Sequence, residues 1–281
     1  MRSRILSVIL LDGTPYGVKT VELSNWNGKA ILAPRAALKK LKELPEAQIP
    51  AVYFLLGADD HVYVGETDEL GQRLSNHDLN RPNWTDLIAF TSPKLSKTEV
   101  KYLEHAFIKR LASDGLVTLE NSTSPKSPTM TREDQDVMEE FVDRASDVLL
   151  SLGYSLLGVS SDVEEAAKQS GVSVICVGPD TDAKGISSES GLLVLKSSLA
   201  RKQITDSFQG HRYLMQRNKM QESGVLKDFD ESHLIYTQDF LFSSASAAAA
   251  ITLGRAANGL TEWKTEDGKT LKELEQTTEV D

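Results

Sequence analysis

The chain has 281 residues, 40% of them hydrophobic, which is enough to bury the core of one large domain or two modest ones. Its formal net charge of -10 argues weakly against nucleic acid as a partner, because phosphate binding needs a basic surface. The single cysteine, Cys176, excludes an internal disulfide and fits a reducing compartment.

The apolar stretch near the start of the sequence is short. It runs from Ile5 to Leu11, ends at Asp12 and is followed by no small-residue cleavage site. A transmembrane helix needs about 20 apolar residues, so this stretch does not predict one. We therefore expect a soluble, cytoplasmic protein without a membrane partner.

Hydrophobic periodicity predicts the elements of the first half of the chain. Alternating patterns and turn residues predict two hairpins, with strands at 4–11 and 18–23, and at 52–56 and 62–65. Helical spacing predicts helices at about 36–44, 68–78, 97–112 and 134–152. A linker rich in Ser, Thr and Pro is expected at 122–131.

The second half predicts a further domain, with strands near 172–177 and 191–196 and a helix of small residues at 244–251. The expected fold class is α/β (α+β): a small mixed or antiparallel sheet flanked by helices, plus a second, smaller α+β domain. The expected segments are an N-terminal extension at 1–48, a core domain at 49–125, a linker and helix at 126–171, and a C-terminal domain at 172–281.

The helix predicted at 97–112 carries a carboxylate on its apolar stripe. Ser96 and Glu99 form a capping-box pattern that marks the start of the helix. Glu104 lies on the stripe between Leu103 and Phe107, where a carboxylate is costly unless it is paired or binds a metal. Taken alone, a glutamate whose carboxylate reaches water at the edge of the stripe is the more common case.

Polar residues also occupy the inward side of the preceding helix and hairpin. Arg73 and His77 are four residues apart and so lie side by side on one helix face, although an arginine stem that covers the core is the ordinary alternative. Tyr53 and Tyr63 are predicted to fall roughly opposite each other across the hairpin, where ordinary strand packing is the commoner role.

If these side chains converge, they suit phosphodiester hydrolysis. A carboxylate can hold a divalent metal, and the metal and an arginine can stabilise the negative charge that develops on phosphate. A tyrosine or histidine can relay a proton.

At these positions the chain resembles the GIY-YIG nuclease family. Ala51-Val52-Tyr53 stands where the family has Gly-Ile-Tyr, and Tyr63-Val64-Gly65 stands where it has Tyr-Ile-Gly. The remaining matches are the helix arginine, a histidine of some restriction enzymes, the metal-binding glutamate and the asparagine that closes the domain: Arg73, His77, Glu104 and Asn121.

The resemblance implies a metal-dependent DNA endonuclease, with restriction or phage defence as its setting. Glu104 would bind one Mg²⁺ or Mn²⁺, Arg73 would contact the scissile phosphate, and Asn121 would play a structural or supporting role. The general base stays unassigned among Tyr53, Tyr63 and His77. A non-catalytic DNA-binding module that retains the nuclease fold and a structure-specific repair nuclease are the alternatives, and the oligomeric state stays open.

The C-terminal half resembles a domain of unknown function that is appended to bacterial GIY-YIG proteins. Four segments carry this resemblance: 191–196, 242–249, 254–255 and 258–259. A basic stretch in this half predicts phosphate contacts with DNA through six residues: Lys196, Arg201, Lys202, Arg212, Arg217 and Lys219. A solvated helix face, or pairing with the acidic tail, is the alternative. Trp263 and Lys264 also suit a DNA contact, although a tryptophan there is more often in the core.

Overall fold

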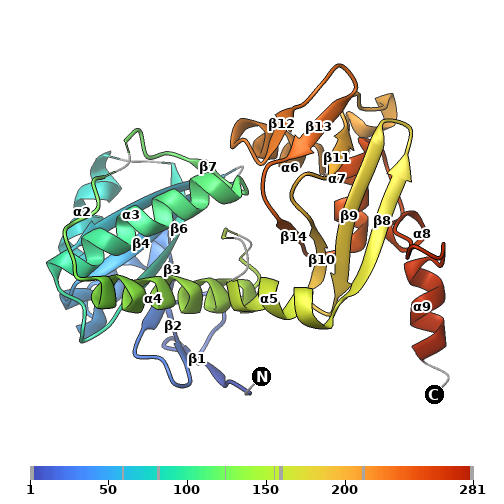
Figure 1. Cartoon of the computed structure of the whole chain (residues 1–281). Coiled ribbons are helices and arrows are strands. Elements are labelled where there is room, and N and C mark those ends of the chain that lie inside the picture. The colour runs from blue at the N-terminus through green and yellow to red at the C-terminus, as the bar shows by residue number, and fades with distance from the viewer. Residues whose placement is uncertain are drawn as a thin grey trace. The chain divides into compact units, whose positions relative to one another are not determined.

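The computed structural model describes residues 3–58, 60–80, 83–123, 125–154, 156–157, 161–210 and 213–278, without the side chains at 76–80, 161–162, 164 and 277–278 (Figure 1). The chain forms two compact units, one of Met1–Ala112 with Val117–Leu157 and one of Ser113–Leu116 with Gly158–Asp281. Within the described ranges each unit has a seven-stranded sheet flanked by helices, so the predicted two-domain α+β class is confirmed.

The sheet of the first unit has the strand order β1-β2-β3-β6-β4-β5-β7. The strands are β1 (Leu6–Leu10), β2 (Lys19–Leu23), β3 (Lys29–Pro34), β4 (Ala51–Gly57), β5 (His61–Thr67), β6 (Trp84–Thr91) and β7 (Thr118–Leu119). All neighbours are antiparallel except β5 and β7. Both predicted hairpins are present. Because β3 pairs with β6, the strands β1, β2 and β3 of the predicted N-terminal extension belong to this sheet.

Three longer helices accompany this sheet: α2 (Leu70–Asn80), α3 (Lys97–Asp114) and α4 (Arg132–Ser151). The predicted helix at 36–44 is shorter, and 3-10 turns η1 (Arg35–Ala37) and η2 (Pro45–Gln48) flank α1 (Leu38–Leu41). Helices α3 and α4 run across one face of the sheet (Figure 1), where Phe107 lies 5.0 Å from Phe54 and Phe141 lies 4.8 Å from Trp26 between ring centroids. Helix α4 is therefore part of the first unit and not of a linker.

The opposite face of the first sheet holds a separate apolar cluster. Tyr53 and Leu55 of β4 pack there with Leu70 and Leu74 of α2. Alternation along β4 therefore sends Tyr53 towards α2 and Phe54 towards α3. The hairpin and α2 place Tyr53, Tyr63 and Arg73 at this face.

The sheet of the second unit has the order β12-β13-β11-β9-β10-β14, with β8 also paired to β9. Its strands are β8 (Val172–Gly178), β9 (Thr181–Ser188), β10 (Gly191–Val194), β11 (Leu199–Arg201), β12 (Leu226–Asp228), β13 (His233–Tyr236) and β14 (Phe240–Phe242). Its helices are α5 (Ser161–Ser170), η3 (Asp206–Phe208), α6 (Tyr213–Glu222), α7 (Ala245–Leu253), α8 (Gly259–Glu262) and α9 (Leu271–Thr278).

The predicted helix of small residues is α7. The Ser244 side chain caps its start by accepting a hydrogen bond from the amide of Ala247, and Gly254 ends it in the left-handed conformation. The helix is buried because its alanines pack closely against the second sheet. No helix within the described residues is long and apolar enough to cross a membrane.

Candidate functional site

Tyr53 and Tyr63 share one face of the β4–β5 hairpin. Tyr53 pairs with Gly65, and Leu55 pairs with Tyr63, so the two tyrosines are diagonal neighbours. They were predicted to fall roughly opposite each other, and the structure offsets them by two residues on the same face. Their ring centroids are 6.3 Å apart.

Gly65 provides the space for the Tyr53 ring. A Cβ atom built on Gly65 would lie 2.4 Å from Oη and 2.5 Å from Cζ of Tyr53, closer than side-chain atoms approach one another. The Tyr53 ring therefore lies directly over the backbone of β5. This contact gives a packing reason for the glycine of the Tyr63-Val64-Gly65 motif.

Arg73 reaches this pair from the first turns of α2. Its Nε donates a hydrogen bond of 3.1 Å to Oη of Tyr53, and it also interacts with the Tyr63 hydroxyl. Tyr53 is fully buried, and this burial raises the pKa of its phenol although the hydrogen bond from Arg73 acts in the opposite direction. Tyr53 thus stays neutral at ordinary pH, while Arg73 itself is exposed.

Glu104 brings a carboxylate from α3 towards the same cluster. Burial raises the pKa of Glu104, and the charge of Glu66 adds to this, while the charges of Arg73 and Lys97 and a backbone hydrogen bond from Glu66 lower it. The net pKa is raised. Glu104 is half-buried and lies near enough to Arg73 and Tyr53 to interact electrostatically with both.

Glu66 is a member of the cluster that the sequence analysis missed. It lies near the end of β5, and Lys97 at the start of α3 places its Nζ 2.8 Å from Glu66 Oε2 and 3.0 Å from Asp68 Oδ2. The only signal in the sequence was an acidic residue directly after the Tyr63-Val64-Gly65 motif. Lys97 compensates part of the negative charge that surrounds Glu104.

Asn121 supports the hairpin from outside. Its Oδ1 accepts a hydrogen bond of 2.9 Å from the amide of Val64, and its Nδ2 donates one of 2.8 Å to the carbonyl of Val64. The side chain thus mimics a neighbouring strand and fixes the backbone next to Tyr63 and Gly65. This placement agrees with a structural role. The side chain of His77, on α2, lies outside the described residues.

The donor set of this cluster suits a hard divalent cation. Mg²⁺ and Mn²⁺ prefer oxygen ligands, and Mg²⁺ is commonly held by one or two carboxylates with water completing its shell. A half-buried carboxylate with a raised pKa, such as Glu104, gains stability from a cation beside it. Among the residues that the structure describes, no group of three or more His, Cys, Asp or Glu side chains could hold a metal. An ion held by Glu104 alone among the protein side chains would take water as its other ligands.

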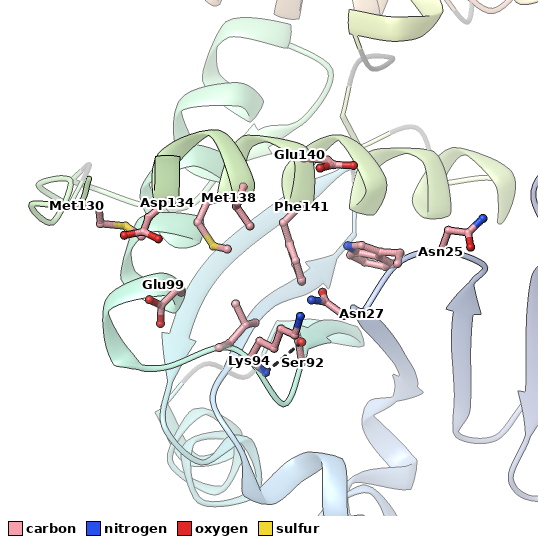
Figure 2. Close-up of a pocket in the computed structure, with 13 residues that line it drawn as sticks. Asn25, Asn27, Ser92, Lys94, Glu99, Met130, Asp134, Met138, Glu140 and Phe141 are labelled. Carbon is pink, nitrogen blue, oxygen red and sulfur yellow. Dashed lines mark hydrogen bonds between the residues drawn. The ribbon is translucent and has the colours of Figure 1, made fainter. Parts of the chain in front are cut away.

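Two cavities of the first unit share no residue with this cluster. One of about 280 Å³ lies between α4 and the segment at 92–95, where Met138 and Phe141 point towards Ser92 and Lys94 (Figure 2). The other, of about 670 Å³, lies beside the turn between β2 and β3. The chemistry of the Tyr53, Arg73 and Glu104 cluster, and not cavity size, identifies it as the candidate site.

Two of the residues predicted to contact DNA are buried in the second unit. Arg217 is 1% exposed, and its guanidinium donates hydrogen bonds to the carbonyls of Ile251 and Arg201. Lys219 is 8% exposed, and its Nζ donates to the carbonyl of Leu116 at 3.5 Å. The expectation that these two residues face a duplex is therefore corrected, because both cations satisfy backbone carbonyls inside the unit.

The other basic residues of this stretch have different surroundings. Arg201 and Lys202 form ion pairs of 3.7 Å with Asp180 and of 3.1 Å with Asp228, and Lys196 is exposed. Arg212 lies outside the described residues. Trp263 is fully buried, so it is a core residue, which was the alternative to a DNA contact. The backbone of its neighbour Lys264 forms hydrogen bonds with the backbone of Ile175.

Comparison with known proteins bears on the second unit alone. Residues 174–275 match the profile of a domain of unknown function (DUF4357). No curated protein and no solved structure matches the chain. The matched segment lies within the predicted C-terminal domain at 172–281.

Proposed function

We propose that the first unit is a metal-dependent endonuclease that hydrolyses phosphodiester bonds in DNA. The hydrogen bond from Arg73 to Tyr53, in a cluster that includes Tyr63 and Glu104, is the observation that carries this proposal. Packing accounts for the burial of Tyr53, but the convergence of a cation and a half-buried carboxylate on its ring is typical of a functional site. We place the activity in the cytoplasm, in restriction or phage defence, on the resemblance to GIY-YIG nucleases and the single buried cysteine.

Arg73 would bind the scissile phosphate. Two phenols hold its guanidinium in one orientation, which reduces the entropy lost when a phosphate oxygen binds. Because Arg73 is exposed, DNA can approach it, and its charge would stabilise the additional negative charge of the transition state. Tyr53 acts here as a positioning residue, since it orients Arg73.

The attacking water needs a proton acceptor. Tyr53 is a poor candidate because burial raises its pKa and because its hydroxyl already accepts a bond from Arg73. Tyr63 is only half-buried and is the better placed of the two phenols. The base is therefore to be sought between Tyr63 and His77, by the pH dependence of the corresponding variants.

Glu104 would hold Mg²⁺ or Mn²⁺. When bound, the ion supplies Lewis-acid stabilisation to the phosphate oxygens. Glu66 adds negative charge beside Glu104, which favours a cation there. Because the carboxylate of Glu66 is paired with Lys97, we assign the cation to Glu104.

Cleavage of supercoiled plasmid DNA with and without Mg²⁺ or Mn²⁺ tests this proposal. We expect Glu104→Gln to abolish cleavage and Arg73→Met to slow it by about a hundredfold or more. Glu140→Gln is the matched control, since Glu140 is an exposed glutamate of α4 in the same unit. A folded Glu104→Gln protein that cuts at the wild-type rate contradicts the assignment. Wild-type protein that binds DNA but never cuts it supports the non-catalytic alternative instead.

A further inference from the structure

Strand β1 forms one edge of the first sheet and is unusually apolar for an edge. Its side chains are exposed at Ile5 (69%), Val8 (43%), Ile9 (48%) and Leu10 (39%). No charged residue and no proline occurs from Ile5 to Leu10. Exposed edges normally carry charges, prolines or bulges that prevent further pairing, so this edge lacks the usual protection.

The backbone of β1 is also available for pairing on its outer side. The amide of Leu11 donates to the carbonyl of Val18 at 3.0 Å, and the amide of Ser24 donates to the carbonyl of Ile5 at 2.9 Å. In an antiparallel ladder the bonds alternate, so odd-numbered residues of β1 face β2. Leu6, Val8 and Leu10 therefore direct their backbone groups outwards, where no strand of the described chain pairs with them. The carbonyl of Leu10 accepts one hydrogen bond, from the amide of Gly13 in the turn, and keeps a second lone pair for a partner strand.

We propose that β1 is a homodimer interface, in which it pairs antiparallel with β1 of a second copy about a two-fold axis at Val8. This register places Val8 against its own copy and Leu6 against Leu10. At each end Arg4 comes to the turn that contains Asp12, so the charged residues stay outside the apolar centre. Within its own chain Arg4 pairs with Asp147, and Asp12 pairs with Lys40. A shift of the axis by one residue would place Arg4 against Leu10, or Leu6 against Asp12.

The side chains favour a second copy over an unrelated peptide. A two-fold interface must be complementary to itself, and β1 meets this condition in its apolar pattern, with charged residues only beyond both ends of the strand. Val8 and Leu6 share a face with Val21 and Leu23, the buried residues opposite them on β2. Pairing would extend this apolar row across the axis and combine the two sheets into one.

Sedimentation velocity of the full chain over a wide concentration range tests the dimer. We expect a dimer whose fraction rises with concentration, and Val8→Lys should raise its dissociation constant by about tenfold or more, because like charges meet at the axis. Val177→Lys is the matched control, since Val177 is a more exposed valine, at 65%, on strand β8. A wild-type protein that stays monomeric throughout, or a dimer that Val8→Lys does not weaken, overturns the proposal.

Hydrogen exchange of the wild-type protein provides a test that does not depend on a variant folding. In the dimer the outward amides of Leu6, Val8 and Leu10 should exchange slowly, and dilution to the monomer should remove this protection. Fast exchange of these amides at concentrations where the protein is dimeric would place the interface elsewhere. This inference does not depend on the proposed nuclease activity.

Discussion

Gly65→Ala should disrupt the candidate site without changing any polar group in it. The new Cβ would lie 2.4 Å from Oη, 2.5 Å from Cζ and 3.1 Å from Cε1 of Tyr53, so the ring must move. The Tyr53 ring is fully buried and packs against α2, so it has little room to move. Its displacement would also break the hydrogen bond from Arg73 to Oη.

Overpacking of this kind costs about 1–3 kcal/mol. The lost hydrogen bond adds about 1 kcal/mol. We therefore expect Gly65→Ala to lower the free energy of unfolding by about 2–4 kcal/mol, measured by chemical denaturation. If the ring of Tyr53 is the cause, the same change in a Tyr53→Leu background should cost much less, and a double-mutant cycle would report this coupling.

Gly71→Ala is the matched control. A Cβ at Gly71 would meet atoms of Lys42 at 3.5–3.6 Å, which is ordinary van der Waals contact, and alanine favours a helix over glycine by about 1 kcal/mol. We expect this variant to be as stable as the wild type or more stable. The packing argument fails if Gly65→Ala unfolds at the wild-type midpoint, or if the two alanine variants are equally destabilised.

Three further predictions concern other parts of the chain. Burial and then the hydrogen bond to Glu139 raise the pKa of Tyr102 to about 12, while an unfolded tyrosine ionises near about 10. Stability should therefore fall as pH rises through this window, and thermal melts of Tyr102→Phe should show less of this loss. Arg217→Leu should destabilise the second unit by about 3 kcal/mol in chemical denaturation, because buried carbonyls lose a charged donor. Reversing Arg201 and Lys202 to glutamate should weaken DNA binding and reduce the salt slope of the affinity by about two, and an unchanged slope would leave the second unit without this role.

Elements with a clear period were predictable from the sequence. The hairpins and α2, α3 and α4 lie within a few residues of their expected positions. The helices have one polar face, and the turn residues between β4 and β5 mark that hairpin although β4 is buried on both faces. Strands β3 and β6 were not predicted. Both are buried for most of their length on both faces, so their apolar runs show no alternation. Their mutual pairing is what joins β1, β2 and β3 to the rest of the sheet.

The basic stretch shows that the number of basic residues in a segment does not predict which of them are exposed. Density along the sequence predicted an exposed cationic surface, but α6 turns Arg217 and Lys219 inwards, where backbone carbonyls accept their hydrogen bonds. Long basic side chains can bury their stems and even their charge when carbonyl acceptors are at hand, and a single sequence does not reveal those acceptors. The partners come from β11, α7 and the segment after α3, all distant in sequence.

The candidate site shows the same division between local pattern and long-range contact. Periodicity was sufficient to place Arg73 and Glu104 beside the apolar stripes of their helices, although Arg73 is exposed. Glu66 and its ion pair with Lys97 depend instead on how α3 meets β5. The position of Arg73, an exposed residue, depends on a buried phenol, and the position of that phenol depends on Gly65. A residue without a side chain thus helps to fix the orientation of the guanidinium that we assign to phosphate. If the proposed function is right, Gly65→Ala should therefore slow cleavage through Arg73 even where the protein remains folded.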